Sequence, residues 1–190
     1  MNTPNKITLV RIFMIPIIVF FYLANFIPFG KIIALVLFII ASATDFLDGY
    51  LARKNNQVTT IGKFLDPIAD KVLVLAGLLL LICDGTVPSP YGVIIGIIII
   101  GRELIISAFR QIASSKNVIM AADKWGKIKT FVTDIALCSL IVLAHANQVG
   151  FTGDLMNVFK IFNWVAIGIA TILTVISAIN YIVKNKSVFK

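Results

Sequence analysis

The sequence predicts an all-α, polytopic membrane protein with six transmembrane helices. Of its 190 residues, 59% are hydrophobic and only 14% are charged, whereas soluble domains are about a quarter charged. Long apolar runs alternate with short polar loops, and at about 20 residues per span the chain has room for six helices. This composition excludes a soluble enzyme and a solvated nucleic-acid-binding domain. We expect residues 1–190 to form a single membrane domain.

Six uncharged runs mark the expected spans, and they differ in length. The first, fifth and sixth are long enough alone, the second and third are too short, and the fourth is full length from about Tyr91 only through its charged end. In chain order the runs are Ile12–Gly30, Ile32–Thr44, Val72–Cys83, Gly85–Gly101, Ile135–Gly153 and Ile161–Val183.

The second, third and fourth spans reach full length only by including charged residues. Charged side chains are costly in lipid, so their presence inside a span indicates a functional interior site. The included residues are Asp45 and Asp48 on the second helix, Asp66, Asp70 and Lys71 on the third, and Arg102 and Glu103 on the fourth.

The basic residues predict the orientation of the chain in a cell membrane. The net charge is +8, and all but two of the 17 Lys and Arg residues fall on one side of the predicted spans. The exceptions are Lys31 and Lys160. Because cytoplasmic loops collect Lys and Arg, we expect both termini, the 2–3 and 4–5 loops and the charged helix ends to be cytoplasmic.

Four of the nine acidic residues fall within 26 residues, and all four are Asp. Asp45 and Asp48 are three residues apart, and Asp66 and Asp70 are four apart, so each pair shares a helix face. The connection between the two helices is short, which makes them antiparallel neighbours. We therefore expect the four carboxylates to converge at one cytoplasmic mouth.

Converging carboxylates need positive charge to stay ionised together. Carboxylate oxygens suit Mg²⁺, Mn²⁺ or Ca²⁺, and the absence of nearby His or Cys argues against zinc. Two such ions could clamp a pyrophosphate. The alternatives are structural: Asp66-Pro67 could cap a helix N-terminus, and Asp45 and Asp48 could pair with Arg53 and Lys54.

The stretch from Asp45 to Asp70 reads DxxDGxxAR-x8-GxxxDxxxD. This pattern resembles, without a mismatch, the signature of the CDP-alcohol phosphotransferases, integral membrane enzymes with six transmembrane helices and a two-metal site. The resemblance implies that the four Asp bind two divalent ions, Mg²⁺ or Mn²⁺, and that Asp70 is also the general base. It implies that the small and basic positions of the signature contact the CDP moiety of the donor; these are Gly49, Ala52, Arg53 and Gly62.

The N-terminal segment acquires a role from the same resemblance. In the family, a segment like Pro4–Arg11 forms a short interfacial helix that helps to hold the cytidine, which implicates Asn5 and Thr8. Helix capping and contact with lipid headgroups are the alternatives for this segment.

A basic set on the fourth and fifth spans could bind the phosphate of the second substrate. Arg102 and Arg110 are eight residues apart and share a helix face. With Lys127 and Lys129 they form the candidate acceptor pocket, in which Glu103 could orient a base. The Gly-Arg-Glu and Gly-Lys-x-Lys-Thr stretches resemble those of family members that use glycerol 3-phosphate as acceptor.

The expected activity is transfer of a phosphatidyl group from CDP-diacylglycerol to glycerol 3-phosphate in the membrane. Serine and inositol phosphate are alternative acceptors within the family. A divalent-cation transporter is the alternative from another class, because intramembrane Asp clusters also mark ion paths. The family resemblance implies a homodimer.

Overall fold

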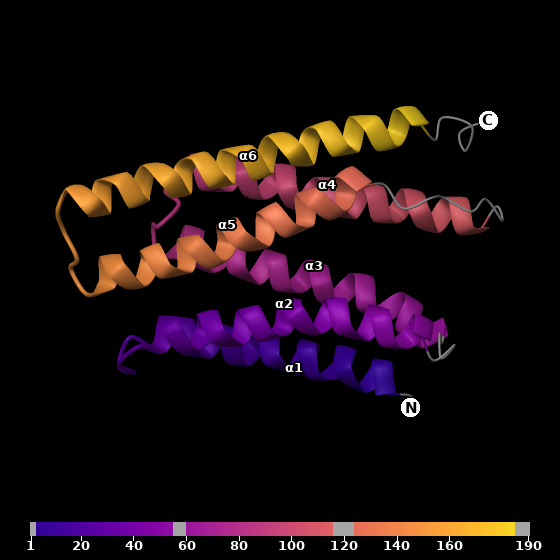
Figure 1. The fold of residues 1–190 in the computed structure, drawn as a ribbon, viewed down its shortest axis with the longest axis horizontal. Coiled ribbons are helices and arrows are strands. Elements are labelled where there is room, and N and C mark those ends of the chain that lie inside the picture. Colours follow the sequence, from indigo (N-terminus) through magenta and orange to yellow (C-terminus); the bar gives the residue numbers. More distant parts are fainter. Residues whose placement is uncertain (1–2, 55–59, 116–123, 185–190) are drawn as a thin grey trace.

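The computed structural model describes residues 3–54, 60–115 and 124–184. Within these residues the chain forms six helices and no strand, so the all-α prediction is confirmed. Figure 1 shows their arrangement as a bundle of long, roughly antiparallel helices. The helices are α1 (Thr3–Leu23), α2 (Gly30–Lys54), α3 (Thr60–Cys83), α4 (Tyr91–Ser115), α5 (Lys124–Gln148) and α6 (Asp154–Lys184).

The N-terminal segment differs from the prediction. Residues 4–11 do not form a separate interfacial helix, because they are the first turns of a continuous α1 that ends at Leu23. The segment contains no glycine, and Pro4 lies in the first turn, where its missing N–H removes no helical hydrogen bond. The return to α2 is tight: a Cβ on Gly30 would lie 2.5 Å from the Phe21 carbonyl oxygen.

The up-and-down course gives the bundle two chemically different ends. At the hairpin end, three short connections join α1 to α2, α3 to α4 and α5 to α6 (Figure 1). At the opposite end, which we call the carboxylate end, α1, α3 and α5 begin and α2, α4 and α6 finish. The predicted grouping of the charged helix ends on one side of the molecule is therefore present.

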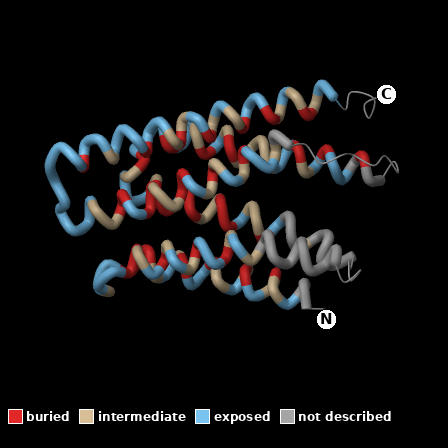
Figure 2. The backbone as a smooth tube through the Cα atoms, in the orientation of Figure 1, coloured by how far each residue is buried: buried red, intermediate tan, exposed pale blue. Residues whose placement is uncertain are grey.

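The interior is apolar along most of the bundle, and the outer faces are apolar as well. Phe38 of α2, Leu81 of α3 and Leu137 of α5 are completely buried in one continuous core. Large hydrophobic side chains also remain exposed on the outside, which Figure 2 shows as pale blue stretches on each helix. A surface of this kind is suited to lipid.

Four helices contain segments that are long and apolar enough to cross a membrane, among the residues that the structure describes. The chain is therefore a membrane protein. The shorter apolar stretch of α2, Gly30–Thr44, stops where the predicted carboxylates begin. The four segments are Lys6–Leu23, Tyr91–Gln111, Gly126–Gln148 and Asp154–Lys184.

A compact polar cluster holds the hairpin end together. The buried Lys31 ammonium lies 2.8 Å from Asp84 Oδ2 and 3.3 Å from the Ala144 carbonyl oxygen. The Tyr22 hydroxyl donates a 2.6 Å hydrogen bond to the same carboxylate. Burial alone would raise the pKa of Asp84, but the bonds from Lys31, Tyr22 and Thr86 hold it below its ordinary value. This cluster joins α1, α2 and α5 to the end of α3.

Candidate active site

The predicted carboxylates lie at the same end of two neighbouring helices. Asp45 and Asp48 are in the last three turns of α2, and Asp66 and Asp70 are in the first three turns of α3. These helix termini meet at the carboxylate end in Figure 1. The side chains of Asp45, Asp48 and Asp66 lie outside the described residues. The backbone shows where each residue stands along its helix.

Most of the residues expected to contact the CDP moiety lie at the same helix ends as the carboxylates. Gly49, Ala52 and Arg53 belong to α2, and Gly62 belongs to α3, at the carboxylate end. Their side-chain surroundings lie outside the described residues, as do those of Asn5 on α1. The remaining residue of the set is different: Thr8 is completely buried within α1's packing face. It therefore does not face lipid headgroups.

The helix-cap alternative for Asp66 is wrong. α3 already begins at Thr60, so Asp66 and Pro67 lie well inside the helix. A capping residue must stand at the boundary, where its side chain can reach unsatisfied backbone N–H groups. Capping therefore does not explain why an Asp stands at position 66, on the same α3 face as Asp70.

Asp70 is the member of the signature whose side-chain burial the structure describes. It is half-buried on α3, and its charge acts on the adjacent Lys71 and on Lys129 of α5. Asp70 therefore lies within electrostatic range of one member of the predicted basic set, Lys129 of α5.

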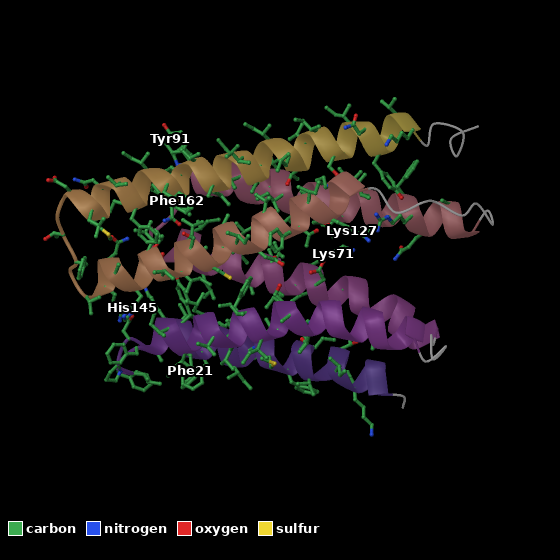
Figure 3. The ribbon with its side chains drawn as sticks, in the orientation of Figure 1. Phe21, Lys71, Tyr91, Lys127, His145 and Phe162 are labelled. Carbon is green, nitrogen blue, oxygen red and sulfur yellow. The ribbon has the colours of Figure 1, made fainter. Side chains whose placement is uncertain are left out.

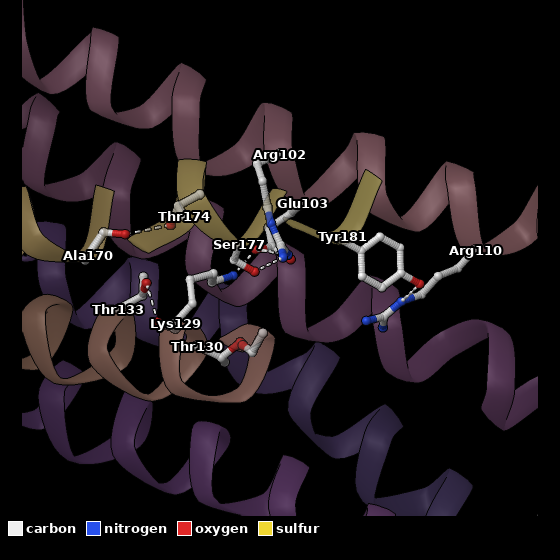
Figure 4. A network of polar contacts seen from close by, with 11 residues as sticks. Arg102, Glu103, Arg110, Lys129, Thr130, Thr133, Ala170, Thr174, Ser177 and Tyr181 are labelled. Atoms are coloured by element: carbon white, nitrogen blue, oxygen red, sulfur yellow. Dashed lines mark hydrogen bonds and ion pairs between the residues drawn. The ribbon is translucent and has the colours of Figure 1, made fainter. Parts of the chain in front are cut away.

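Two of the predicted basic residues, Arg102 of α4 and Lys129 of α5, meet a hydroxyl of α6 in one buried cluster (Figure 4). Glu103 accepts from both Lys129 Nζ and Arg102 Nη1, the latter at 3.4 Å. Arg102 Nη2 also donates a 2.6 Å hydrogen bond to Ser177 Oγ. Lys129 is only 4% exposed, so this charge is held inside the bundle. The prediction that Glu103 orients a base agrees with these contacts.

The other two predicted bases, Arg110 and Lys127, are not bonded to Glu103 within the described part of the chain. Arg110 lies two turns beyond Arg102 on α4, where its Nε donates a 3.1 Å hydrogen bond to the Tyr181 hydroxyl of α6. Lys127 is exposed, on a different face of α5 from the buried Lys129. Figure 3 labels it toward the carboxylate end. The structure thus brings Arg102 and Lys129 together and leaves Lys127 at the surface.

Polar residues that the sequence interpretation did not single out lie beside the carboxylate end of α2. The completely buried Arg11 donates from Nε to the Ala41 carbonyl oxygen at 3.1 Å. Ser42 donates a 2.7 Å hydrogen bond to Asp134 of α5. Ala41 and Asp45 are four residues apart on one helix face. In the sequence, Asp134 could have been noticed as the acid that directly precedes the uncharged run Ile135–Gly153.

Comparison with known proteins decides the family. The sequence model of the CDP-alcohol phosphatidyltransferases matches residues 1–184, nearly the whole chain. The chain belongs to the CDP-alcohol phosphatidyltransferase family. The resemblance drawn from the Asp45–Asp70 signature is thereby confirmed.

Individual relatives cover the same length. A Bacillus subtilis protein is 39% identical over all of this chain and 97% of its own length. A Rickettsia bellii protein is 35% identical over 99% of this chain and 97% of its own length. One from Haemophilus influenzae is 37% identical over 95% of this chain and 91% of its own. All three are named CDP-diacylglycerol–glycerol-3-phosphate 3-phosphatidyltransferase.

CDP-alcohol phosphatidyltransferases are generally dependent on divalent metal ions. The donor set at the carboxylate end of this chain fits such ions, because four Asp on two adjacent helices offer hard oxygen ligands. Elsewhere in the described part of the chain, no three His, Cys, Asp or Glu side chains are grouped so as to hold a metal. The α2–α3 carboxylates are therefore the candidate metal site of this family member.

Proposed function

We propose that this chain transfers the phosphatidyl group of CDP-diacylglycerol to glycerol 3-phosphate, giving phosphatidylglycerophosphate and CMP. The observation that carries the proposal is the position of Asp70, whose charge acts on the buried Lys129 of the Arg102–Glu103–Lys129 cluster. A base beside buried cations suits an acceptor that carries both a hydroxyl and a phosphate. The names of the full-length relatives support the same activity.

The donor would bind at the carboxylate end of α2 and α3. Its contacts would come from Asn5, Thr8, Gly49, Ala52, Arg53 and Gly62. Small residues allow a nucleotide to approach the helix backbone, and the planar Arg53 guanidinium suits a diphosphate. The four residues Asp45, Asp48, Asp66 and Asp70 would hold two divalent ions, Mg²⁺ or Mn²⁺, which when bound supply positive charge to the diphosphate.

The acceptor would bind with its phosphate toward α4 and α5. Arg102, Arg110 and Lys129 would hold that phosphate, with Lys127 at the rim. Guanidinium groups bind phosphate by paired hydrogen bonds, and a partly buried site strengthens each charge interaction. The free hydroxyl of the glycerol chain would then extend toward Asp70 on α3.

Asp70 would take the proton from this hydroxyl as the oxygen attacks the β-phosphorus of the donor. A new oxygen–phosphorus bond forms, and the bond from that phosphorus to the bridging oxygen breaks. CMP departs with the bonding electrons. In phosphoryl transfer, positioning and charge neutralisation supply most of the rate. The acyl chains of the donor stay in lipid, which accounts for a site at the end of membrane helices.

The charge placement disfavours the cation-transporter alternative. The predicted carboxylates lie in the terminal turns of α2 and α3, whereas an ion path needs polar groups near the middle of the membrane. The transporter hypothesis also leaves the small residues of the signature unexplained. We further propose a single domain over 1–190, a location in the cell membrane with termini and site facing the cytoplasm, and a homodimer.

The test is an acceptor screen with purified protein in detergent. CMP release from CDP-diacylglycerol is measured with glycerol 3-phosphate, serine, inositol phosphate or no acceptor. We expect turnover with glycerol 3-phosphate, its loss in excess EDTA, and recovery with Mg²⁺ or Mn²⁺. Turnover with serine alone would replace the proposed acceptor, and full activity in excess EDTA would overturn the metal assignment.

A further inference from the structure

The inward stripe of α6 contains two hydroxyl groups near the carboxylate end. Ser177 is 1% exposed and Tyr181 is 2% exposed, and they lie four residues apart on one face. A hydroxyl buried between helices is costly unless it forms a hydrogen bond. The buried residues of this stripe are Met156, Asn163, Ile167, Ala170, Thr174, Ser177 and Tyr181.

Each hydroxyl accepts a hydrogen bond from a different arginine of α4. Arg102 Nη2 bonds Ser177 Oγ at 2.6 Å, and Arg110 Nε bonds the Tyr181 hydroxyl at 3.1 Å (Figure 4). The Arg110 guanidinium carbon also lies 5.2 Å from the centre of the Tyr181 ring. The bond to Tyr181 uses Nε, so it leaves the two terminal nitrogens of Arg110 available for another contact.

The spacing on the two helices is unequal. The arginines are eight residues apart, about 12 Å along α4, whereas Ser177 and Tyr181 are four residues apart, about 6 Å along α6. The long Tyr181 side chain spans this difference, because its ring reaches along the bundle toward Arg110 (Figure 4). Both guanidinium groups are thereby held against α6.

The charges around these arginines favour an anion. The charges of Arg102 and Lys71 both act on Lys129, and that of Arg110 acts on Lys71, so the four cations form a chain of neighbouring charges. Glu103 is the carboxylate bonded to two of them, and Asp70 and Asp134 are also near enough to act on Lys129. A phosphate dianion would reduce the repulsion among the cations.

We propose that Ser177 and Tyr181 are positioning residues that hold the Arg102 and Arg110 guanidinium groups in place for one phosphate monoester. This inference rests on the proposed function and deepens it, because it assigns selection of a phosphorylated acceptor to α6. The competing explanation is structural: the two hydroxyls tie α4 to α6 and have no influence on substrate. The two explanations differ in which substrate responds when a hydroxyl is removed.

The variants remove one hydroxyl at a time. Tyr181→Phe keeps the ring and its edge contact with Phe109, and Ser177→Ala removes a single oxygen. The matched control is Thr174→Val, because Thr174 is completely buried on the same stripe and its hydroxyl donates to the Ala170 carbonyl oxygen of its own helix. In the described part of the chain, this buried hydroxyl bonds within α6 and not to α4.

Saturation curves for both substrates are measured on each variant in detergent. We expect Ser177→Ala and Tyr181→Phe to raise the KM for glycerol 3-phosphate about 2- to 10-fold, the range for one lost hydrogen bond. The KM for CDP-diacylglycerol should stay unchanged, and Thr174→Val should change neither. In an Arg102→Ala background, Ser177→Ala should add little. Equal shifts in both KM values, or shifts matched by Thr174→Val, would overturn the proposal.

A binding measurement separates this inference from the proposed function. The melting temperature of each variant is recorded with increasing glycerol 3-phosphate and, separately, inorganic phosphate, without donor. The parent chain should be stabilised by both, Thr174→Val equally, and Ser177→Ala only at higher ligand concentration. If the parent forms no product from glycerol 3-phosphate but shows this pattern, the acceptor assignment fails and the phosphate subsite stands. If neither anion stabilises the parent, the subsite is disproved.

Discussion

The two ends of the bundle both bury charged groups, but they balance them differently. At the hairpin end, Lys31 faces Asp84, and Tyr22 and the Ala144 carbonyl oxygen complete the set. Toward the carboxylate end, Glu103 bonds both Arg102 and Lys129, and Arg102 also bonds the Ser177 hydroxyl. The pair at the hairpin end forms a joint between helices, whereas the two cations that share Glu103 belong to the site at which we propose that a phosphate binds.

This comparison predicts that substitutions at one end affect chemistry and those at the other affect stability. The largest effect is expected at Asp70. Asp70→Asn keeps the shape of the side chain but removes the proposed base, so turnover should fall at least about 100-fold. Turnover and melting temperature of the purified variant are measured together. Near-normal turnover would show that another group takes the proton.

The hairpin end should respond in the opposite way. Asp84→Ala leaves the buried Lys31 ammonium without its carboxylate, and we expect unfolding to become easier by about 2–3 kcal/mol, less than for a fully buried pair because Asp84 is 18% exposed. Denaturation in detergent measures this change. Turnover per folded molecule at low temperature should remain normal. A lost acceptor response with normal stability would contradict the division between the ends.

The basic residues of the site offer a sharper contrast. Arg110→Ala removes a base bonded to Tyr181, whereas Lys127→Ala removes an exposed base on another face of α5. A charged phosphate contact is worth about 1.5–3 kcal/mol, so Arg110→Ala should raise the KM for glycerol 3-phosphate roughly 10- to 150-fold. Lys127→Ala should raise it much less. Equal effects of the two variants would indicate a diffuse attraction and not a built pocket.

The smallest effect concerns pH at the hairpin end. In the folded chain the pKa of Asp84 lies below its ordinary value. The ionised carboxylate therefore stabilises the folded chain fully at any pH above the pKa that Asp84 has in the unfolded chain. That contribution is lost as the pH falls through the folded pKa, below about pH 4. Melting temperatures between pH 3 and 7 should therefore fall at the acid end. Asp84→Asn should be less stable at neutral pH and show a flatter profile.

The sequence alone predicted the parts of the molecule that depend on local pattern. Hydropathy predicted six helices, and the Asp spacing predicted their grouping on two helix faces at one end. Both follow from the helical repeat, which is a property of neighbouring residues. The separate interfacial helix expected for Pro4–Arg11 was wrong, because these residues continue into α1 without a break.

Contacts between distant helices could not be predicted in this way. Lys31 lies between the first two predicted spans and Asp84 between the third and fourth, 53 residues further along the chain, yet the two are bonded. Ser177 and Tyr181 lie more than 70 residues from their arginine partners. Ser and Tyr are common in membrane helices, so their pairing depends on how α6 packs against α4, which a single sequence does not reveal.

The short apolar stretch of α2 has a consequence for the lipid around it. Gly30–Thr44 spans about 22 Å at 1.5 Å per residue, whereas the hydrocarbon core of a bilayer is about 30 Å thick. Where a hydrophobic length falls short, the bilayer thins locally. The depression would lie over the carboxylate end of α2. A diacylglycerol backbone resting in this dip would meet water-borne reactants below the general level of the leaflet, without being pulled out of it.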